Sequence, residues 1–411
     1  MIQRIKYHNS PARNQPVSVR LPLSKSLSNR HLFLQFQFSE LRAIKSFSTA
    51  RDTQLFYEGL RNASYQIDFR DAGTPSRFAL VFFAVHNIPK IISGSSSLRK
   101  RSISDLVNTL IEQGAQIEYL EKPGFFPVEI KSGIQNSKDI WEINTQESSQ
   151  FVSALMLGVT KLQPIPRIKV NGLAHSWSYI KLTQSVLEDW GFQVEINDGS
   201  IAIDGKPKNH SDVEIEIDWG SAAFVYLMAL FTQKSFRLIG ARQNSLQADY
   251  ACVAAFAQLG ITTVFDVDGA VISPGPISNI QNLMHFNGSE SIDLIPVLAS
   301  ACAFLGKDIQ FTGIEKLAVK ESNRIESIRI NLTTLGFQWE ANTSGYLLKN
   351  EHRSMPKRFD IKTFNDHRIA MAFAPWAAII DDVSIDDTQC AKKSYPQYWE
   401  HLKMCNFELI S

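Results

Sequence analysis

The feature that most constrains this chain is a junction that recurs along it, where an apolar helix pattern ends in glycine and an alternating strand pattern follows. It reads LIEQGAQIEYL around Gly114, VLEDWGFQVEI around Gly191, AFAQLGITTVF around Gly260 and LTTLGFQWEAN around Gly336. A weaker copy surrounds Gly59, and the last copy carries Asn406 in place of glycine. Both residue types suit this position, because a helix often ends with a residue at positive φ. The pattern predicts an α/β fold.

Successive junctions from Gly114 to Asn406 are about 70 residues apart, which exceeds the roughly 20–50 residues of a solenoid repeat. Such a period suits an α/β unit with two helices and several strands. The length of 411 residues is long for one domain and comfortable for two. Six units distributed over two domains is therefore the simplest arrangement.

The charge balance excludes several classes of function. With 42 Lys and Arg against 41 Asp and Glu, the net charge is +1, so no global basic field is available to bind nucleic acid. No apolar run approaches the roughly 20 residues needed to span a bilayer, and the N-terminal segment lacks the apolar core of a secretory signal. The four cysteines form no CxxC pair (Cys252, Cys302, Cys390 and Cys405). We expect them to be buried free thiols in a reducing compartment, the cytoplasm.

Several predicted helices start with a capping residue followed by a cation. Lys25 and Arg30 belong to one such start, and Arg77, Arg324 and Arg368 belong to three others. A basic first turn is unfavourable, because a helix N-terminus itself carries about +0.5 charge. The repeated pattern indicates an anion as the partner, since backbone N–H groups and cations together bind phosphate and carboxylate. The alternative, a neighbouring carboxylate at each site, stays open.

The chain has no Walker loop, dinucleotide-binding turn or metal-binding motif. We therefore expect neither a cofactor nor a metal.

A series of short fragments follows in a fixed order over residues 21–396: PLSKSLSNR, DAGTPSR, SLRKRSISDLV, ESSQF, SWSYIK, DWGSAAF, NSLQAD, SIDLIP, VKESNRIESI, FNDHRIAM and AKKSYP. In this order the series resembles the 5-enolpyruvylshikimate-3-phosphate (EPSP) synthase family. The resemblance implies an α/β fold of two lobes, the enolpyruvyl transferase fold, with three βαβαββ-like units in each lobe. Residues 1–22 and 218–411 would form the first lobe and residues 23–217 the second, and the lobes would close over the substrates.

The activity that the resemblance implies is transfer of the enolpyruvyl group from phosphoenolpyruvate to the 5-hydroxyl of shikimate 3-phosphate, with release of phosphate. This reaction belongs to the shikimate pathway of aromatic amino acid biosynthesis. We expect a monomeric enzyme whose partners are these two small anions, without nucleic acid or membrane.

The resemblance also implies roles for individual residues. Asp293 would be the base on the 5-hydroxyl, and Glu321 would be the acid on the methylene carbon, with Lys25 and His367 assisting. Shikimate 3-phosphate would be bound by Lys25, Ser26, Arg30, Ser148, Ser149, Gln150, Ser176, Tyr179, Asp293, Lys316 and Lys320. Phosphoenolpyruvate would be bound by Lys25, Gly73, Arg101, Gln150, Arg324, Arg368 and Lys393.

The residues alone leave simpler explanations open. Asp293 and His367 could cap helices. Glu321 could simply pair with Arg324 three residues later, and Tyr179 could belong to the core.

Two other functions also remain as alternatives. UDP-N-acetylglucosamine enolpyruvyl transferase has the same fold, but it begins its active site with a Lys-Asn pair and typically uses a loop cysteine. This chain has Lys25 followed by Ser26, and its first cysteine is Cys252. A non-catalytic sugar-phosphate-binding relative is favoured only by departures from the family pattern, such as Asp71 and Lys316 where asparagine is commoner. Such a relative would have lost the acid, the base or the arginine residues of the site, and this chain has all of them.

Overall fold

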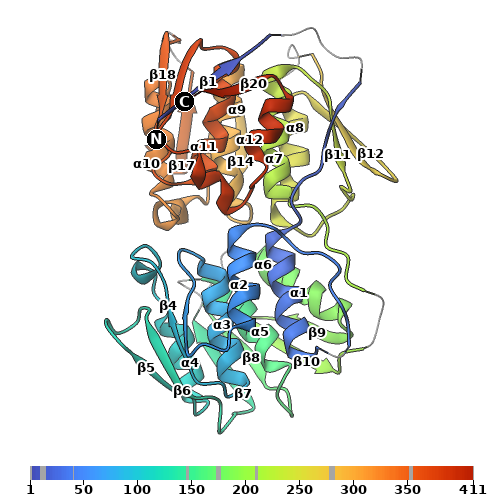
Figure 1. The fold of residues 1–411 in the computed structure, drawn as a ribbon, viewed down its shortest axis with the longest axis vertical. Coiled ribbons are helices and arrows are strands. Elements are labelled where there is room, and N and C mark those ends of the chain that lie inside the picture. Colours follow the sequence, from blue (N-terminus) through green and yellow to red (C-terminus); the bar gives the residue numbers. More distant parts are fainter. Residues whose placement is uncertain are drawn as a thin grey trace. The chain divides into compact units, whose positions relative to one another are not determined.

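The computed structural model describes residues 2–9, 15–39, 41–144, 148–172, 177–208, 212–276, 283–350 and 355–410. The chain divides into two compact units (Figure 1). Unit 1 contains Met1–Pro22 and Glu216–Ser411, and unit 2 contains Leu23–Ile215. The chain thus crosses back from unit 2 into unit 1 at Glu216, close to residue 218, where the motifs predicted this crossing.

Unit 1 contains three four-stranded sheets within its described residues, ordered β18-β19-β1-β20, β12-β13-β11-β2 and β14-β15-β17-β16. Their strands are β1 (Gln3–Tyr7), β2 (Val17–Val19), β11 (Phe236–Ile239), β12 (Ile261–Asp266), β13 (Gly269–Pro274), β14 (Leu283–Asn287), β15 (Asp308–Thr312), β16 (Gln338–Asn342), β17 (Gly345–Lys349), β18 (Arg358–Ile361), β19 (Asp382–Ile385) and β20 (Phe407–Ile410). The helices are α7 (Trp219–Thr232), α8 (Cys252–Gln258), α9 (Ile295–Leu305), α10 (Arg324–Thr334), α11 (His367–Phe373) and α12 (Tyr398–Met404). Short 3₁₀ turns are η2 (Ala248–Ala251), η4 (Ile292–Leu294), η5 (Glu315–Val319), η6 (Ala374–Ala378) and η7 (Gln389–Lys393).

Unit 2 contains two four-stranded sheets in the part of it that is described, ordered β3-β4-β6-β5 and β7-β8-β10-β9. Their strands are β3 (Gln66–Asp68), β4 (Lys90–Ser93), β5 (Gln116–Tyr119), β6 (Val128–Ser132), β7 (Ile140–Asn144), β8 (Arg167–Asn171), β9 (Phe192–Asn197) and β10 (Ser200–Gly205). The helices are α1 (Lys25–Gln37), α2 (Arg51–Arg61), α3 (Gly73–Val85), α4 (Ser104–Glu112), α5 (Ser149–Val159) and α6 (Trp177–Asp189), with the 3₁₀ turn η1 (Leu98–Lys100).

All five sheets share one pairing pattern, which reveals an internal repeat. Each has a parallel pair at one edge, such as β14 with β15, and continues with two antiparallel pairs, such as β15 with β17 and β17 with β16. Within its described residues, unit 2 has only the parallel bridge between Ile44 and Val213 where a third sheet was expected. In this part of unit 2, a side chain takes the place of a strand partner for a backbone amide: Ser28 Oγ accepts a hydrogen bond from the Ser48 amide.

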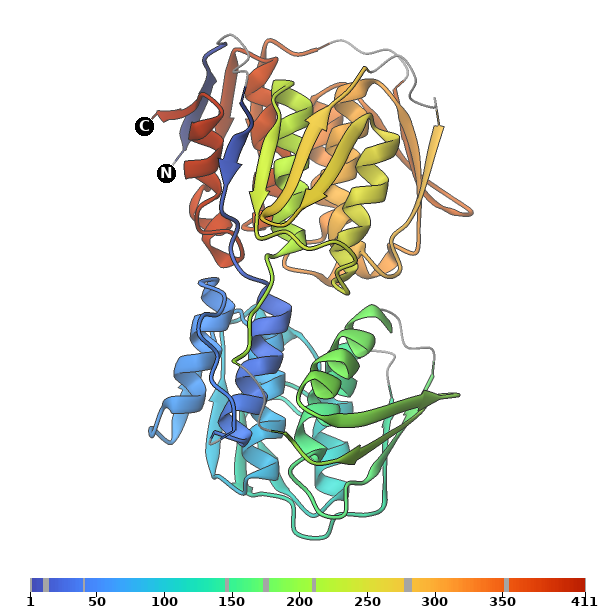
Figure 2. The same cartoon turned by 90° about the vertical axis from the view of Figure 1, so that its right-hand side faces the viewer.

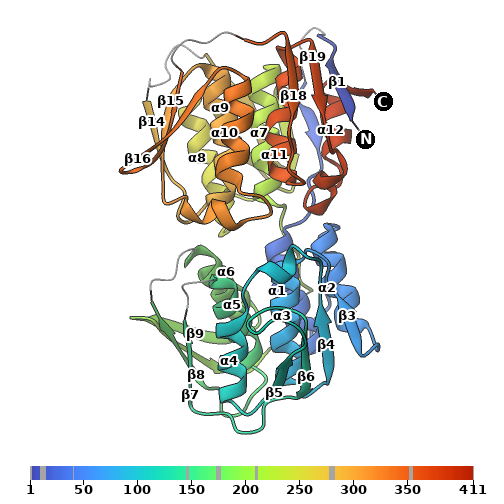
Figure 3. The same ribbon diagram turned by 90° about the vertical axis from the view of Figure 1, so that its left-hand side faces the viewer.

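The inner helices of both units are apolar on all sides, which is typical of helices enclosed by other elements. In unit 1 these are α7 and α9, whose side chains are almost all buried. Figure 2 shows the sheet of β11 and β13 lying against α7, and Figure 3 shows α9, α10, α7 and α11 side by side. In unit 2, α3 and α5 pack together in the same manner.

The recurring junction is confirmed at five of its six positions. The residues that end the helices have φ angles of 87° (Gly114), 97° (Gly191), 83° (Gly260), 85° (Gly336) and 74° (Asn406). The prediction was wrong at Gly59, which lies inside α2 because that helix continues to Arg61. Glycine is required there by packing, since a Cβ would lie 2.7 Å from Cζ of the buried Phe69.

The four cysteines are buried free thiols, as expected. None of the helices in the described ranges combines the length and the apolar character that a membrane crossing requires.

Candidate active site

Arg324 is the centre of a buried charged cluster in unit 1. It begins α10, and its side chain is 1% exposed. Its guanidinium donates from Nε to Asp366 Oδ2 (2.7 Å), from Nη1 to Asp293 Oδ1 (2.6 Å) and from Nη2 to Glu321 Oε2 (2.5 Å). A further bond runs from Nη2 to Asp366 Oδ1 (3.2 Å). One guanidinium thus holds three carboxylates, which we call the carboxylate cluster.

Three further cations border the carboxylate cluster. Arg368 Nη2 lies 3.3 Å from Asp293 Oδ2, and Arg368 Nη1 donates to the Asp293 carbonyl oxygen at 3.1 Å. Lys320 Nζ lies 3.5 Å from Asp293 Oδ1, and Lys393 Nζ lies 3.2 Å from Glu321 Oε1. These cations come from the start of α11 and the ends of η5 and η7. The fold therefore gathers at one end of unit 1 six residues that the sequence assigned to the site.

The cations determine the charge state of the two carboxylates assigned to proton transfer. Burial by itself raises the pKa of Asp293, but the nearby cations, Arg368 foremost, outweigh it and lower the pKa below its usual value. Burial opposes ionisation of Glu321 as well, and Arg324 and Lys393 hold its pKa well below the usual range. Both groups are therefore ionised at neutral pH. Asp293 is ready to accept a proton, whereas Glu321 must first gain one.

Asp366 is a site residue that the sequence reasoning missed. It is completely buried, and it caps α11 by accepting a hydrogen bond from the Arg368 amide at 3.0 Å. The hydroxyl of Ser322 donates to its Oδ2 at 3.1 Å. Its capping position was visible in the sequence, but its bonds to Arg324, 42 positions away, were not.

Asp249 was also missed. It lies in η2, and Gly220 at the start of α7 allows its close approach: a Cβ on Gly220 would lie 2.6 Å from Asp249 Oδ2 and 3.2 Å from Arg368 Nη2. Burial raises the pKa of Asp249 to about 6, although the charge of Arg368 acts in the opposite direction. Asp249 ends the fragment NSLQAD, but the fragment gave it no role in the site.

His367 lies beside the carboxylate cluster and is 2% exposed. Neither ring nitrogen has a hydrogen-bond partner within the described ranges, and Nδ1 is 3.9 Å from Asp366 Oδ1. Burial lowers the pKa of His367 well below its usual value, despite the opposing charge of Glu321. The imidazole is therefore neutral, and a neutral ring can both donate and accept a hydrogen bond.

Lys316 lies in η5, four residues before Lys320. Partial burial and then the charge of Lys320 lower its pKa. The assignment of Lys316 to shikimate 3-phosphate stays a prediction.

The second group of site residues lies in unit 2, around Gly73 at the start of α3. A Cβ on Gly73 would lie 3.1 Å from Arg101 Nη1, which is a tight contact, and 3.4 Å from Arg77 Nη1, so both guanidinium groups lie close against this glycine. Arg77 Nη1 donates to Gln150 Oε1 at 2.5 Å, which joins α3 to the start of α5. Arg101 Nη2 is buried and has no hydrogen-bond partner among the residues that the structure describes. We call Arg77 and Arg101 the arginine pair; the resemblance assigned Arg101 to phosphoenolpyruvate, whereas Arg77 was indicated only by the charge pattern at its helix start.

The start of α1 carries Lys25, Ser26 and Arg30. Ser24 caps the helix by accepting a hydrogen bond from the Leu27 amide, and Lys25 Nζ lies 3.1 Å from Asp52 Oδ2. Lys25 and Ser26 are partly exposed.

Arg30 is only 2% exposed and binds other parts of the protein. Its guanidinium donates to Thr183 Oγ1, to Ser153 Oγ and to the carbonyl oxygens of Ser26 and Tyr179. Burial lowers the pKa of Arg30 to about 10. These contacts tie α1 to α5 and α6, and the Tyr179 ring lies 5.9 Å from the guanidinium carbon.

The start of α5 was predicted to bind phosphate. Ser148 caps this helix by accepting a hydrogen bond from the Gln150 amide at 3.2 Å, and Ser149 is buried. Ser176, which was assigned to the same ligand, lies outside the described residues.

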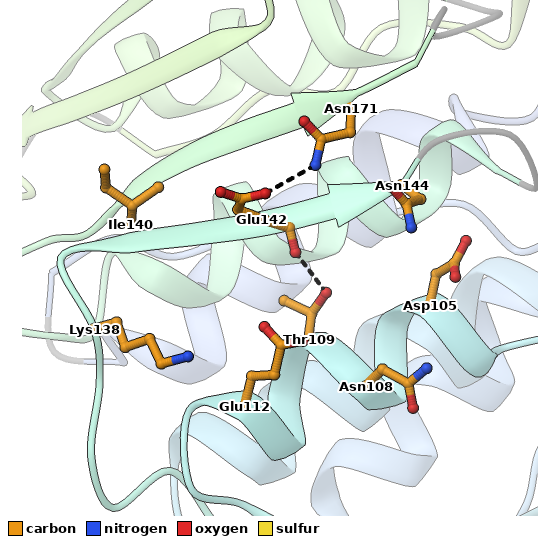
Figure 4. Close-up of a pocket in the computed structure, with 9 residues that line it drawn as sticks. All are labelled: Asp105, Asn108, Thr109, Glu112, Lys138, Ile140, Glu142, Asn144 and Asn171. Carbon is orange, nitrogen blue, oxygen red and sulfur yellow. Dashed lines mark hydrogen bonds between the residues drawn. The ribbon is translucent and has the colours of Figure 1, made fainter.

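A polar pocket in unit 2 has a different character. Its volume is about 420 Å³, and it lies between α4 and the strands β7 and β8 (Figure 4). Its lining residues are Asp105, Asn108, Thr109, Glu112, Lys138, Ile140, Glu142, Asn144 and Asn171. Three of these side chains are carboxylates and one is a lysine, so an anionic substrate is disfavoured. None of the predicted site residues lines this pocket.

Comparisons with known proteins agree with one another. Residues 38–402 match the family model described as EPSP synthase (3-phosphoshikimate 1-carboxyvinyltransferase). A 3-phosphoshikimate 1-carboxyvinyltransferase of Bacteroides fragilis (strain YCH46) is 31% identical over 396 residues, covering 95% of each chain. One from Neisseria meningitidis serogroup B is 26% identical, covering 95% of this chain and 96% of the relative.

Among solved structures, an EPSP synthase from Acinetobacter baumannii superimposes with a TM-score of 0.77 at 19% identity over all of both chains. The two-lobed α/β fold expected from the motifs is thereby confirmed.

Proposed function

The chain belongs to the EPSP synthase family, and from this premise we propose how its own side chains carry out the family's reaction. The enzyme transfers the enolpyruvyl group of phosphoenolpyruvate to the 5-hydroxyl of shikimate 3-phosphate and releases phosphate. The residue assignment rests on one observation. Asp293 and Glu321 both accept hydrogen bonds from the guanidinium of Arg324. A base and an acid are thus held a short distance apart among fixed cations.

In the addition step, the 5-oxygen of shikimate 3-phosphate forms a bond to C2 of phosphoenolpyruvate. Asp293 takes the hydroxyl proton, and Glu321 delivers a proton to C3, which becomes a methyl group. The lowered pKa of Asp293 makes it a weak base, so it acts on a hydroxyl that nearby cations polarise. Lys320, which lies 3.5 Å from Asp293, is the cation placed for this task.

In the elimination step, the C2–O bond to phosphate breaks and a proton leaves C3, which restores the double bond. Phosphate departs with the bond's electron pair, and Glu321 takes back the proton. The same carboxyl group therefore acts first as acid and then as base.

Glu321 has to gain a proton before it can act as the acid. Arg324 and Lys393 keep it ionised in the structure. Both cations are also assigned to phosphoenolpyruvate, so the substrate's anions compete with Glu321 for them. Substrate binding then raises the pKa of Glu321 by weakening its ion pairs.

The cations assigned to the ligands carry the opposite charge to them. Two phosphates and two carboxylates bring a combined charge of roughly −6. In unit 1, Arg324, Arg368 and Lys393 carry three positive charges, which the ligands would share with the carboxylate cluster. In unit 2, Lys25 and the arginine pair add three, and Arg101 and Gly73 bind phosphoenolpyruvate. Arginine suits this role because its planar fork grips carboxylate and phosphate with two parallel bonds.

The contacts of shikimate 3-phosphate are assigned to Lys25, Ser26, Ser148, Ser149, Gln150 and Tyr179, with Ser176 and Lys316 as further members. We keep Arg30 in this set as a supporting residue, because its guanidinium donates hydrogen bonds to the carbonyl oxygens of Ser26 and Tyr179. Most of its own N–H groups are already bonded to other parts of the protein. The enzyme is proposed to work as a cytoplasmic monomer, which fits its four buried free thiols.

The test of this function is a phosphate-release assay in which each substrate is omitted in turn. Release should require both phosphoenolpyruvate and shikimate 3-phosphate. Replacing shikimate 3-phosphate by UDP-N-acetylglucosamine should abolish release. Release with the nucleotide sugar would favour the rival transferase, and no release with either acceptor would favour a non-catalytic relative.

A further inference from the structure

We propose that Ser95 and Asp71 are positioning residues that hold Arg101 against the start of α3 for phosphoenolpyruvate binding. The inference rests on the proposed function of Arg101 and adds two residues to which the resemblance gave no role.

Two turns of unit 2 are joined side by side at this place. The Ser95 amide donates to the Arg70 carbonyl oxygen at 2.9 Å, and the Ser95 hydroxyl donates to Asp71 Oδ1. Gly94 permits the contact, because a Cβ there would lie 2.6 Å from the Arg70 carbonyl oxygen. The backbone and side-chain bonds together fix the segment before η1 to the segment before α3.

Ser95 also organises the turn that carries Arg101. Its hydroxyl oxygen accepts a hydrogen bond from the Leu98 amide at 3.4 Å, and its carbonyl oxygen accepts one from the Arg99 amide at 3.0 Å. The Arg101 amide then donates to the Leu98 carbonyl oxygen at 3.0 Å, where η1 ends. A continuous chain of hydrogen bonds therefore runs from Asp71 through Ser95 to the backbone of Arg101.

The end of this chain is the position where an anion is needed. Arg101 Nη1 comes within 3.1 Å of the place that a Gly73 Cβ would occupy. Arg101 Nη2 is buried without a hydrogen-bond partner in the described ranges, and an unsatisfied buried donor is costly. The phosphate or carboxylate of phosphoenolpyruvate would satisfy it, but only if the turn holds the guanidinium in place.

The residue at position 71 fits this role. A carboxylate offers only acceptor atoms, so the Ser95 hydroxyl must donate to it, which leaves the hydroxyl oxygen to accept from Leu98. By donating to Asp71 Oδ1, the Ser95 hydroxyl also occupies a lone pair of this carboxylate. Without this hydrogen bond, the full negative charge of Asp71 would lie close to an anionic substrate. Asparagine, the commoner residue in the family, offers one acceptor oxygen and preserves the same bond.

The experiment compares the Michaelis constants for both substrates in five variants: Ser95→Ala, Asp71→Ala, Asp71→Asn, Arg101→Ala and the double variant Ser95→Ala/Arg101→Ala. Ser104→Ala, which removes a hydroxyl from the first residue of α4, is the matched control. Circular dichroism and a thermal unfolding curve check that each variant is folded.

Ser95→Ala and Asp71→Ala should each raise the KM for phosphoenolpyruvate by about tenfold, with the KM for shikimate 3-phosphate changed by less than about twofold. Asp71→Asn should retain most of the affinity, and Ser104→Ala should resemble the wild type. In the Arg101→Ala background, Ser95→Ala should have no further effect, because its contribution acts through Arg101.

Two failures are distinguishable. If Arg101→Ala leaves the KM for phosphoenolpyruvate unchanged, the proposed role of Arg101 is wrong, and this inference falls with it. If Arg101→Ala raises that KM while Ser95→Ala does not, or if the two effects multiply in the double variant, only the positioning role is overturned. Should Ser95→Ala fail to fold, the contrast between Asp71→Ala and Asp71→Asn decides the question, and equal KM values for those two would refute it.

Discussion

Replacing Arg324 by methionine tests the carboxylate cluster directly. The change removes four hydrogen bonds to Asp293, Glu321 and Asp366 and leaves these carboxylates with less compensating charge. Removing one partner of a buried ion pair costs about 3–5 kcal/mol. Total stabilities of about 5–15 kcal/mol are usual, so the variant should lose a large part of its free energy of unfolding.

The chain offers a matched control on the same helix. Arg329 also lies in α10 and pairs with Glu326 three residues before it, but both side chains are close to half exposed. Because water screens such a pair, Arg329→Met should change stability very little. Urea unfolding followed by tryptophan fluorescence gives the free energy of each variant. A loss below about 1 kcal/mol for Arg324→Met, or equal losses for both variants, would refute the reasoning.

The pH dependence of the Arg324→Met effect provides a second test. The pKa values of Asp293 and Glu321 are lowered in the folded protein. Their ion pairs therefore stabilise the fold above the unfolded pKa of about 4, and this contribution is lost as pH falls towards the folded values. The difference between wild type and variant should be largest near neutral pH and should shrink below about pH 4. A constant difference across this range would contradict the account.

The remaining predictions concern the base, a helix contact and a buried histidine. Asp293→Asn should reduce kcat by about 10²–10⁴-fold, the usual contribution of a general base, with little change in shikimate 3-phosphate binding measured by calorimetry; near-normal turnover would remove it from this role. Gly59→Ala should destabilise unit 2 by about 1–3 kcal/mol through overpacking against Phe69, and an unchanged thermal unfolding curve would contradict this. His31 accepts a hydrogen bond from Trp190, and burial lowers its pKa to about 4, so stability falls as pH drops below the unfolded value of about 6.5. Between pH 7 and pH 5, His31→Gln should lose about 2 kcal/mol less free energy of unfolding than the wild type; equal losses would place the pH sensitivity elsewhere.

The part of the fold that the sequence predicted well is local. A positive φ after a helix depends on one residue and its neighbours, so Gly114, Gly191, Gly260 and Gly336 could be identified from the pattern alone. Gly59 lies in a similar sequence pattern, but glycine is needed there because the Phe69 ring packs against α2. That contact is set by tertiary structure, and no local pattern carries it.

The same distinction applies to the candidate site. The cations at helix starts were visible as an unfavourable charge pattern, and Arg324 and Arg368 do meet in one cluster. The alternative of a carboxylate partner is also true for Arg324, which binds Glu321 as well as Asp366. Asp366 could not be recognised, because its role depends on a contact between two helix starts that only the fold brings together.

The origin of the protons in the transfer is the measurement that tests the central claim most directly. The wild-type enzyme is run in D₂O with unlabelled substrates, and the product is analysed by NMR. If Glu321 protonates C3 and later removes a proton, the vinyl carbon of the product must carry deuterium, and Glu321→Gln must lose this labelling together with turnover. A product formed at the normal rate without deuterium in its vinyl group would show transfer without addition, and would contradict the account.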